Sequence, residues 1–280
     1  DNMTKKTIID YYDYTMPMYR LLWHGDTNAV HYGIWDKNIK NLKEALLNTN
    51  KIVTNLLKIK CADEILDAGC GIGGSSVWIA KNTGAKVTGI TLSQRQLEKA
   101  QKLAEKEGVS QTTFFSIMDY TKTTFPDNKF GAVFAIESAC HANPKINFLK
   151  EAYRILKPGG KIAVIDGFIN RDPKNQKEQK WLCEFYEGMA LQSLDKVSDF
   201  MESARKVGFK NLRFIDKTKE IMPSSKIIHD MCLWGYPGSI ILEKLHLFPH
   251  LMTTNCLAGL VQYQSMKNGM GRYGIIYGEK

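Results

Sequence analysis

Short apolar runs alternate with amphipathic stretches through the first part of the chain. The runs predict buried strands at 63–67, 86–90, 112–116, 131–136 and 161–167. Stretches of helical periodicity at 42–58, 73–82, 93–107 and 145–156 precede or separate them. Because strands and helices alternate, the pattern predicts an α/β fold with a parallel sheet covered on both faces.

The remainder of the chain is mostly helical by the same criterion. Candidate helices lie at 181–188, 194–207 and 227–247, and candidate strands at 210–216 and 271–280. Residues 157–160 (KPGG) predict a helix stop and a turn, because proline blocks continuation of the helix and glycine permits a reversal.

Composition narrows the class of protein. The 280 residues are 44% apolar, which is ample for a core, and no uncharged apolar run is long enough to span a bilayer. No secretory signal is visible, so we expect a cytoplasmic protein without stable membrane insertion, or an organellar one if a transit peptide was removed. The net charge of +9 is spread along the chain, so nucleic-acid binding is not expected, although an anionic small substrate stays open. The six cysteines lack metal-ligand spacing, and no metal site is predicted.

The segment 64–76 (EILDAGCGIGGSS) joins a strand to a glycine-rich turn and a helix. Gly69, Gly71 and Gly74 nominally satisfy the dinucleotide pattern, so a nucleotide cofactor is the alternative to weigh. Asp67, however, would repel phosphates at the helix N-terminus, and the second strand ends in Thr91 where a dinucleotide enzyme carries a ribose-binding acid. S-adenosylmethionine (SAM) carries a sulfonium and an ammonium but no phosphate. SAM is therefore the predicted cofactor.

Four motifs in order carry a resemblance to a known family. Residues 66–71 (LDAGCG), 89–93 (GITLS), 118–119 (MD) and 156–160 (LKPGG) resemble the motifs of class I SAM-dependent methyltransferases, and GITLS is similar to the form in sterol, tocopherol and cyclopropane-forming members. The resemblance implies a Rossmann-like sheet with an antiparallel last strand and S-adenosylhomocysteine as product. It also implies three parts: an aromatic N-terminal lid of helices (1–40), the SAM-binding core (41–170), and a helical substrate cap with the final strands (171–280).

The same resemblance assigns the cofactor contacts. It puts the methionine part of SAM on the glycine turn, the ribose after the second strand and the adenine after the third. The departure is Thr91, where most members have an acid. The predicted set is Asp67, Gly69, Gly71, Thr91, Leu92, Gln96, Met118, Asp119 and Ile136.

Residues 134–141 (FAIESACH) resemble a segment of sterol C-methyltransferases. Methylation of an alkene creates a carbocation, which Glu137 is expected to stabilise or deprotonate, with His141 as a possible base. The alternative is that Glu137 caps the following helix and His141 packs against it. Tyr11, Tyr19 and Tyr32 in the lid are expected to line the substrate pocket, where aromatic faces attract cations.

The predicted function is SAM-dependent C-methylation of a small terpenoid, sterol-like or quinol-like molecule. Two alternatives stay open: N- or O-methylation of a small amine or hydroxyl compound, and a SAM-binding protein that catalyses a cyclisation or serves as a partner. A monomer and a homodimer are both compatible with the sequence. Apolar residues of the cap suggest a hydrophobic pocket, namely Met222, Met231, Trp234, Leu247, Phe248 and Met252.

Overall fold

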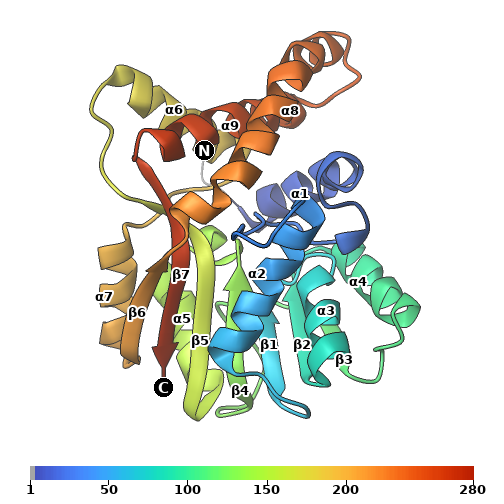
Figure 1. The fold of residues 1–280 in the computed structure, drawn as a ribbon, viewed down its shortest axis with the longest axis vertical. Helices are drawn as coiled ribbons and strands as arrows, with labels where there is room; N and C mark the ends of the chain where they lie inside the picture. Colours follow the sequence, from blue (N-terminus) through green and yellow to red (C-terminus); the bar gives the residue numbers. More distant parts are fainter. Residues whose placement is uncertain (1–3) are drawn as a thin grey trace.

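A single seven-stranded sheet organises the computed structural model, which describes residues 4–280 (Figure 1). The strands are β1 (Glu64–Ala68), β2 (Lys86–Thr91), β3 (Thr113–Ile117), β4 (Phe130–Ile136), β5 (Leu156–Ile169), β6 (Lys210–Asp216) and β7 (Gly271–Glu279). Their order in the sheet is β3-β2-β1-β4-β5-β7-β6. The pairs from β3 to β5 are parallel, whereas β7 runs antiparallel to both β5 and β6. The predicted fold class is confirmed.

Both faces of the sheet are buried, as the apolar strands require. Side chains along β5 alternate between two cores: Ile162 and Val164 pack with α5 (Lys145–Ile155) and α7 (Val197–Val207), whereas Ala163 and Ile165 pack with α2 (Leu42–Leu57) and α3 (Gly74–Thr83). Helix α4 (Gln94–Lys106) lies beside α3 and β3. The sheet therefore has no solvent-exposed face in its centre, and ligands can approach only at its edges or strand ends.

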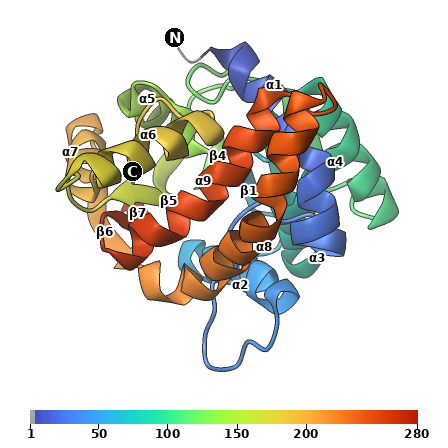
Figure 2. The same cartoon turned by 90° about the horizontal axis from the view of Figure 1, so that it is seen from above.

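The remaining helices gather over the carboxyl ends of the parallel strands (Figure 1). They are α1 (Lys5–Tyr19), α6 (Gln176–Gly188), α8 (Thr218–Lys244) and α9 (His250–Lys267), and α8 and α9 lie side by side as a hairpin (Figure 2). Short helical turns follow α1 (η1, Arg20–His24, and η2, Gly25–Thr27) and β4 (η3, Ala139–His141). Residues 1–3 of the predicted lid lie outside the described part of the chain. Between residues 4 and 280, no helix combines the length and apolar character needed to cross a membrane.

The helical segment after β6 differs from the prediction. Helix α8 begins nine residues before the predicted start at 227 and continues through Pro223 and Pro237, which the sequence pattern treats as breakers. Helix α9 was not predicted. It packs against both α6 and α8, so it has no single apolar face, and Thr254 and Gln262 are buried within it. A helix enclosed on several sides carries no clear helical periodicity.

The predicted turn at 157–160 is part of a longer strand. Strand β5 begins at Leu156, which pairs with Phe130, and the register shifts before Lys161 pairs with Ala132. Gly159 has a φ of +74°, which a residue with a side chain rarely adopts. Helix α5 therefore ends before this segment, at Ile155, as predicted, whereas the expected turn is the irregular start of β5, which Gly159 bends.

Candidate active site

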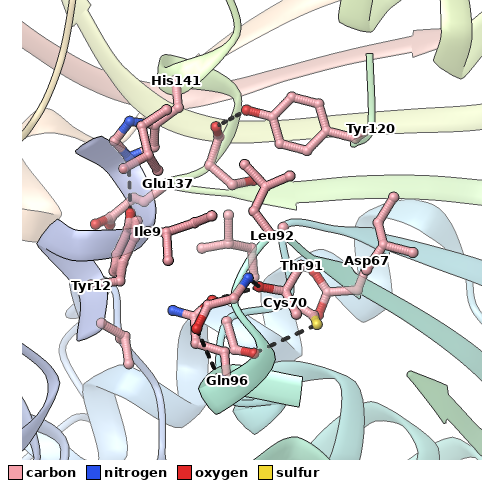
Figure 3. Close-up of a pocket in the computed structure, with 18 of the residues that line it drawn as sticks. Ile9, Tyr12, Asp67, Cys70, Thr91, Leu92, Gln96, Tyr120, Glu137 and His141 are labelled. Carbon is pink, nitrogen blue, oxygen red and sulfur yellow. Dashed lines mark hydrogen bonds between the residues drawn. The ribbon is translucent and has the colours of Figure 1, made fainter. Parts of the chain in front are cut away.

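Two cavities lie above the carboxyl ends of the strands and share part of their walls. The first, the cofactor cavity, has a volume of about 310 Å³ and includes the ends of β1, β2 and β4 (Figure 3). The second, the apolar cavity, has a volume of about 390 Å³ and is enclosed largely by α1, α6, α8 and α9. Five residues line both cavities: Tyr12, Val30, His31, Glu137 and His141. These shared residues mark the place where two bound molecules can meet.

The glycine turn after β1 forms one wall of the cofactor cavity. Gly69 has a φ of +93°, and a β-carbon there would stand 2.5 Å from Cβ of Ser138. Gly71 has a φ of +53°, and a β-carbon there would enter space with no atom within 4 Å. Gly69 is therefore needed for close packing against Ser138, whereas Gly71 lets a ligand approach the backbone closely.

Asp67 is the buried acid of the cofactor cavity, with 2% of its surface exposed. Ser76 Oγ donates a hydrogen bond of 2.6 Å to its carboxylate. Burial raises the pKa of Asp67 to about 7, and the hydrogen bond from Ser76 only partly opposes that rise. A cationic ligand beside this carboxylate would favour its ionised form. The residues present therefore fit the sulfonium and ammonium of SAM.

The ends of β2 and β3 supply polar groups to the same cavity. Thr91 donates a hydrogen bond of 2.5 Å from its hydroxyl to Oε1 of the buried Gln96. Asp119 forms a 2.6 Å salt bridge with Lys5 of α1 and accepts two hydrogen bonds from Thr121. Partial burial acts to raise the pKa of Asp119, but these donors outweigh it and the pKa is lowered. Asp119 is therefore an acceptor-only group at neutral pH.

The structure brings all nine predicted cofactor residues to the cofactor cavity. Figure 3 shows Asp67, Thr91 and Gln96 on one side and Tyr12, Glu137 and His141 on another. The nine are Asp67, Gly69, Gly71, Thr91, Leu92, Gln96, Met118, Asp119 and Ile136. Their common location follows from the parallel sheet, because the carboxyl ends of adjacent strands meet at one edge.

Glu137 stands at the junction of the two cavities in a strained backbone conformation. Its φ is +49°, which costs a residue with a side chain about 1 kcal/mol or more. Oε1 accepts hydrogen bonds of 2.7 Å from the backbone N–H of Tyr32 and from the hydroxyl of Tyr273. Burial raises the pKa of Glu137 to about 8, although both hydrogen bonds act to lower it. The side chain does not cap the following helix, so that alternative is wrong.

His141 lies across the junction from Glu137 and contacts the N-terminal helix. Its Nε2 and the hydroxyl of Tyr12 are hydrogen-bonded at 2.9 Å, and the rings meet edge to face (Figure 3). Burial lowers the pKa of His141 to about 4, so the imidazole is neutral at physiological pH. Tyr12 thus links the lid to the loop after β4, a contact that sequence reasoning missed.

A buried lysine and a buried aspartate hold the loop that carries His141. Lys145 Nζ donates to the carbonyls of Cys140 and Ala142, both at 2.8 Å, and to that of Ser193 at 3.1 Å. Asp166 accepts from the backbone N–H of Cys140 at 2.9 Å. The sequence does not predict the burial of either group, because a lysine in an amphipathic helix and an acid at a strand end are usually solvated. Together they fix the position of the peptide directly before His141.

Among the residues that line the apolar cavity are Tyr11, Tyr19 and Tyr32, the three tyrosines that the sequence analysis expects in a substrate pocket. Asn255 donates hydrogen bonds of 3.0 Å to the hydroxyls of Tyr11 and Tyr19. Three of the six apolar cap residues line the cavity, namely Met231, Phe248 and Met252. Met222 does not, and Trp234 and Leu247 point outward with 85% and 67% of their surfaces exposed, so the expectation is wrong for these three.

Charge is distributed unevenly around the apolar cavity. Among residues 4–280, its lining includes the acids Glu137 and Asp166 but no lysine or arginine. Burial raises the pKa of Asp166 to about 6. An anionic group bound here would face two carboxyls and no compensating cation, which is costly in a low-dielectric site.

The buried carboxyls predict an unusual pH dependence of stability. The folded-state pKa values of Asp67 (about 7) and Glu137 (about 8) exceed their unfolded values, so the folded form retains protons that the unfolded form has released. The free energy of unfolding of the ligand-free protein should therefore fall between pH 6 and pH 8, by about 1.4 kcal/mol per pH unit for each retained proton. Thermal melts across this range check the prediction, and Glu137→Gln should flatten the slope. A melting temperature that rises with pH would contradict it.

Comparison with known proteins agrees with the geometry. Residues 66–164 match the family described as a methyltransferase domain. The methyltransferase GfsG of Streptomyces halstedii is 28% identical over 78% of this chain and 78% of its own length. Cycloartenol-C-24-methyltransferase 1 of Oryza sativa subsp. japonica is 33% identical over 71% of this chain, but the chain covers only 57% of that protein.

Solved structures share the fold along nearly the whole chain. The [4+2]-cyclase SpnF aligns with a TM-score of 0.79 and 24% identity, covering 99% of this chain and 96% of that one. Geranyl diphosphate methyltransferase in complex with GPP and sinefungin aligns with a TM-score of 0.75 and 20% identity, covering 98% of each chain. In its domain match, fold and buried acid, the chain is similar to class I SAM-dependent methyltransferases, among them sterol and prenyl C-methyltransferases, and this similarity supports SAM as its cofactor.

Proposed function

We propose that the protein methylates a carbon atom of a small, uncharged, largely apolar acceptor, such as a terpenoid, sterol-like or quinol-like molecule. The observation that carries the proposal is the meeting of the cofactor cavity and the apolar cavity at the carboxyl of Glu137. SAM, when bound, supplies an electrophilic methyl group on its sulfonium. Holding both molecules at a shared wall provides proximity and excludes water.

The proposal gives each cofactor residue a task. Asp67 faces the cationic methionine part, Gly71 allows it to approach the backbone, and Gly69 keeps the turn packed against Ser138. Thr91 and Gln96 hold the ribose. Met118 and Asp119 contact the adenine, and Leu92 and Ile136 pack around the cofactor. The support is their shared location on one cavity, together with the raised pKa of a buried acid that a cation would ionise.

At the junction, Glu137 is a better candidate for the proton acceptor than His141. Methylation of an alkene leaves positive charge on the acceptor, which an adjacent carboxylate stabilises before it takes a proton. Burial raises the pKa of Glu137 to about 8 and lowers that of His141 to about 4, so the carboxylate is the stronger base of the two. His141 and Tyr12 would then close the wall of the site and exclude water.

The Tyr12 hydroxyl offers a direct test of this closure. Tyr12→Phe should lower kcat by about fivefold, because it removes one hydrogen bond worth about 1 kcal/mol at the junction. Tyr14→Phe on the same helix is the matched control, because Tyr14 is 56% exposed and lies outside both cavities. Steady-state kinetics measure kcat for both variants. Equal kcat values in Tyr12→Phe and Tyr14→Phe would show that the Tyr12 hydroxyl has no role in the reaction.

A second candidate function is O-methylation of a hydroxyl compound. The neutral imidazole of His141, already hydrogen-bonded to a hydroxyl at 2.9 Å, favours it, since the same nitrogen can face an acceptor hydroxyl. A third candidate is a SAM-binding protein that catalyses a cyclisation without transferring a methyl group. The [4+2]-cyclase SpnF shares the fold of this chain, and this similarity of fold is the support for the third candidate. Neither alternative explains the placement of Glu137 in an apolar wall.

Labelled SAM separates the three functions. The purified protein is incubated with methyl-labelled SAM and panels of terpenoid alcohols, sterols, quinols and amines, and S-adenosylhomocysteine is quantified in parallel. With acceptors that contain no amine, label that survives acidic ether cleavage supports C-methylation, whereas label lost in that step supports O-methylation. Surviving label on an amine acceptor supports N-methylation. A changed acceptor without S-adenosylhomocysteine supports cyclisation. Prenyl diphosphates should be poor acceptors, because the apolar cavity carries acids and no lysine or arginine among the described residues.

A further inference from the structure

Exposed apolar side chains gather at one end of the molecule. In the described part of the chain, eight of the ten large exposed apolar residues lie on α1, η1, α8 or the short loop after α8. They are Tyr14, Leu21, Leu22, Leu233, Trp234, Ile241, Leu245 and Leu247, which we call the apolar end. The other two, Phe114 and Ile117, lie on the edge strand β3. An accumulation of this kind on a folded protein usually marks an interaction surface.

The exposed residues of α8 form a continuous stripe. Trp234, Ile241 and Leu245 are separated by seven and then four positions, so they lie on one face of the helix. Their exposed fractions are 85%, 59% and 61%. Figure 1 shows that the end of the α8–α9 hairpin projects away from the sheet, so this stripe has no other element of the described chain packed over it.

The apolar end is continuous with the wall of the apolar cavity. Leu22, which is half exposed, also lines the cavity, as do Leu242 and Phe248. The residues next to these in the chain, Ile241 and Leu247, point outward. The same helical turns therefore present apolar groups both to the exterior and to the cavity.

The charge around the apolar end favours one occupant over others. Arg20, Lys244 and His246 are exposed beside the apolar residues, and in the described part of the chain no ion pair joins Arg20 or Lys244 to an acid. The whole chain carries a net charge of +9. Each basic residue near an anionic bilayer contributes about 1 kcal/mol, and an exposed tryptophan settles at the level of the headgroups. A second copy of the same cationic chain would instead be repelled at long range.

We propose that the apolar end docks on the surface of a bilayer that contains anionic lipid, and that the apolar acceptor enters the cavity from that bilayer. The proposal rests on the proposed function only for the entry of the acceptor. Docking itself depends on the exposed side chains and their charge. It is peripheral, with α8 lying against the interface, and none of the helices described between residues 4 and 280 is long and apolar enough to span the bilayer.

Vesicle binding tests the docking. The full chain is sedimented with vesicles of phosphatidylcholine alone and of phosphatidylcholine with phosphatidylglycerol. Binding is expected to the anionic vesicles, and the double variant Trp234→Ser, Leu245→Ser should weaken it by about tenfold or more, because two large side chains lose their burial in lipid. The matched control is Phe114→Ser, Ile117→Ser, which removes the two exposed apolar residues of β3 and should leave binding unchanged.

Three results would overturn the proposal. The first is the absence of binding to anionic vesicles, and the second is an equal loss of binding in both double variants. The third is a wild-type protein that is a dimer in solution and a Trp234→Ser, Leu245→Ser variant that is a monomer. The last result would assign the surface to a second copy.

Entry of the acceptor is tested separately from the reaction. Trp234 and Leu245 do not line either cavity, so their variant should keep its kcat with an acceptor delivered in cyclodextrin and lose turnover with the same acceptor embedded in vesicles. Equal turnover in both formats would overturn the route through the bilayer. Failure of every acceptor in both formats would count against the proposed function, whereas the sedimentation result would still decide the docking.

Discussion

Asp67→Asn is expected to weaken S-adenosylhomocysteine binding by about 30-fold or more while the fold persists. The carboxylate is almost fully buried in the cofactor cavity, and the ligand ammonium should pair with it. Loss of one partner of a buried charge pair costs about 2 to 5 kcal/mol, which corresponds to that change or a larger one. Asp67→Ala should abolish binding. Calorimetric titration measures the affinity, and a thermal melt checks the fold.

The control for Asp67 lies on the same strand. Glu64 is an exposed acid at the opposite end of β1, and Glu64→Gln should leave the affinity unchanged. Titration with NADH provides the second control, since an ionised Asp67 in the cofactor cavity would repel the phosphates of NADH. Unchanged S-adenosylhomocysteine affinity in Asp67→Asn, or NADH binding alone, would contradict the site assignment.

The pH dependence of binding follows from the same carboxyl group. In the ligand-free protein the pKa of Asp67 is about 7, so roughly half of the molecules carry a proton there at neutral pH. A ligand cation lowers this pKa, and binding therefore releases a proton. The affinity should rise from pH 6 to pH 8, and the proton should appear as a buffer-dependent enthalpy. Both effects should vanish in Asp67→Asn.

The cofactor side of the site was predictable because its parts are local. The carboxyl end of each strand is visible in the sequence as a change from apolar to polar residues. In a parallel sheet these carboxyl ends lie along one edge. Asp67 and Thr91 lie at the carboxyl ends of β1 and β2, Asp119 lies just after β3, and all three line the same cavity. No contact distant in the chain was needed to locate them.

The acceptor side was less predictable because distant segments build it. Glu137 accepts a hydrogen bond from Tyr273, 136 positions along the chain, and His141 meets Tyr12, 129 positions away. The role of Lys145 could not be predicted for another reason. Its position on a helix does not indicate that its ammonium group donates to three backbone carbonyls. The outward direction of Trp234 depends on helix α9, which the pattern did not reveal. Apolar character alone cannot tell a cavity wall from an exposed surface.

Glu137→Gln should lower turnover by about 10² to 10⁴ and leave S-adenosylhomocysteine affinity nearly unchanged. The amide keeps the size of the side chain and can still accept the hydrogen bonds from Tyr32 and Tyr273. It cannot carry the negative charge or take the proton that the proposed reaction needs, and these roles have effects of this magnitude. Kinetics with an acceptor found by labelled SAM measure kcat, and calorimetry measures the affinity.

The pH profile distinguishes a reacting carboxylate from a merely structural one. With a pKa of about 8, Glu137 is mostly protonated at neutral pH without ligand, so kcat/KM should rise with pH through this range. Tyr273→Phe removes a hydrogen bond that lowers the pKa, so it should shift the rising limb to higher pH, whereas Glu137→Gln should abolish the limb. If Glu137→Gln retained both near-normal turnover and the limb, the carboxyl would serve only to hold Tyr32 and Tyr273 in place. In that case His141 would become the remaining candidate for the base, and O-methylation would become the stronger reading of the site.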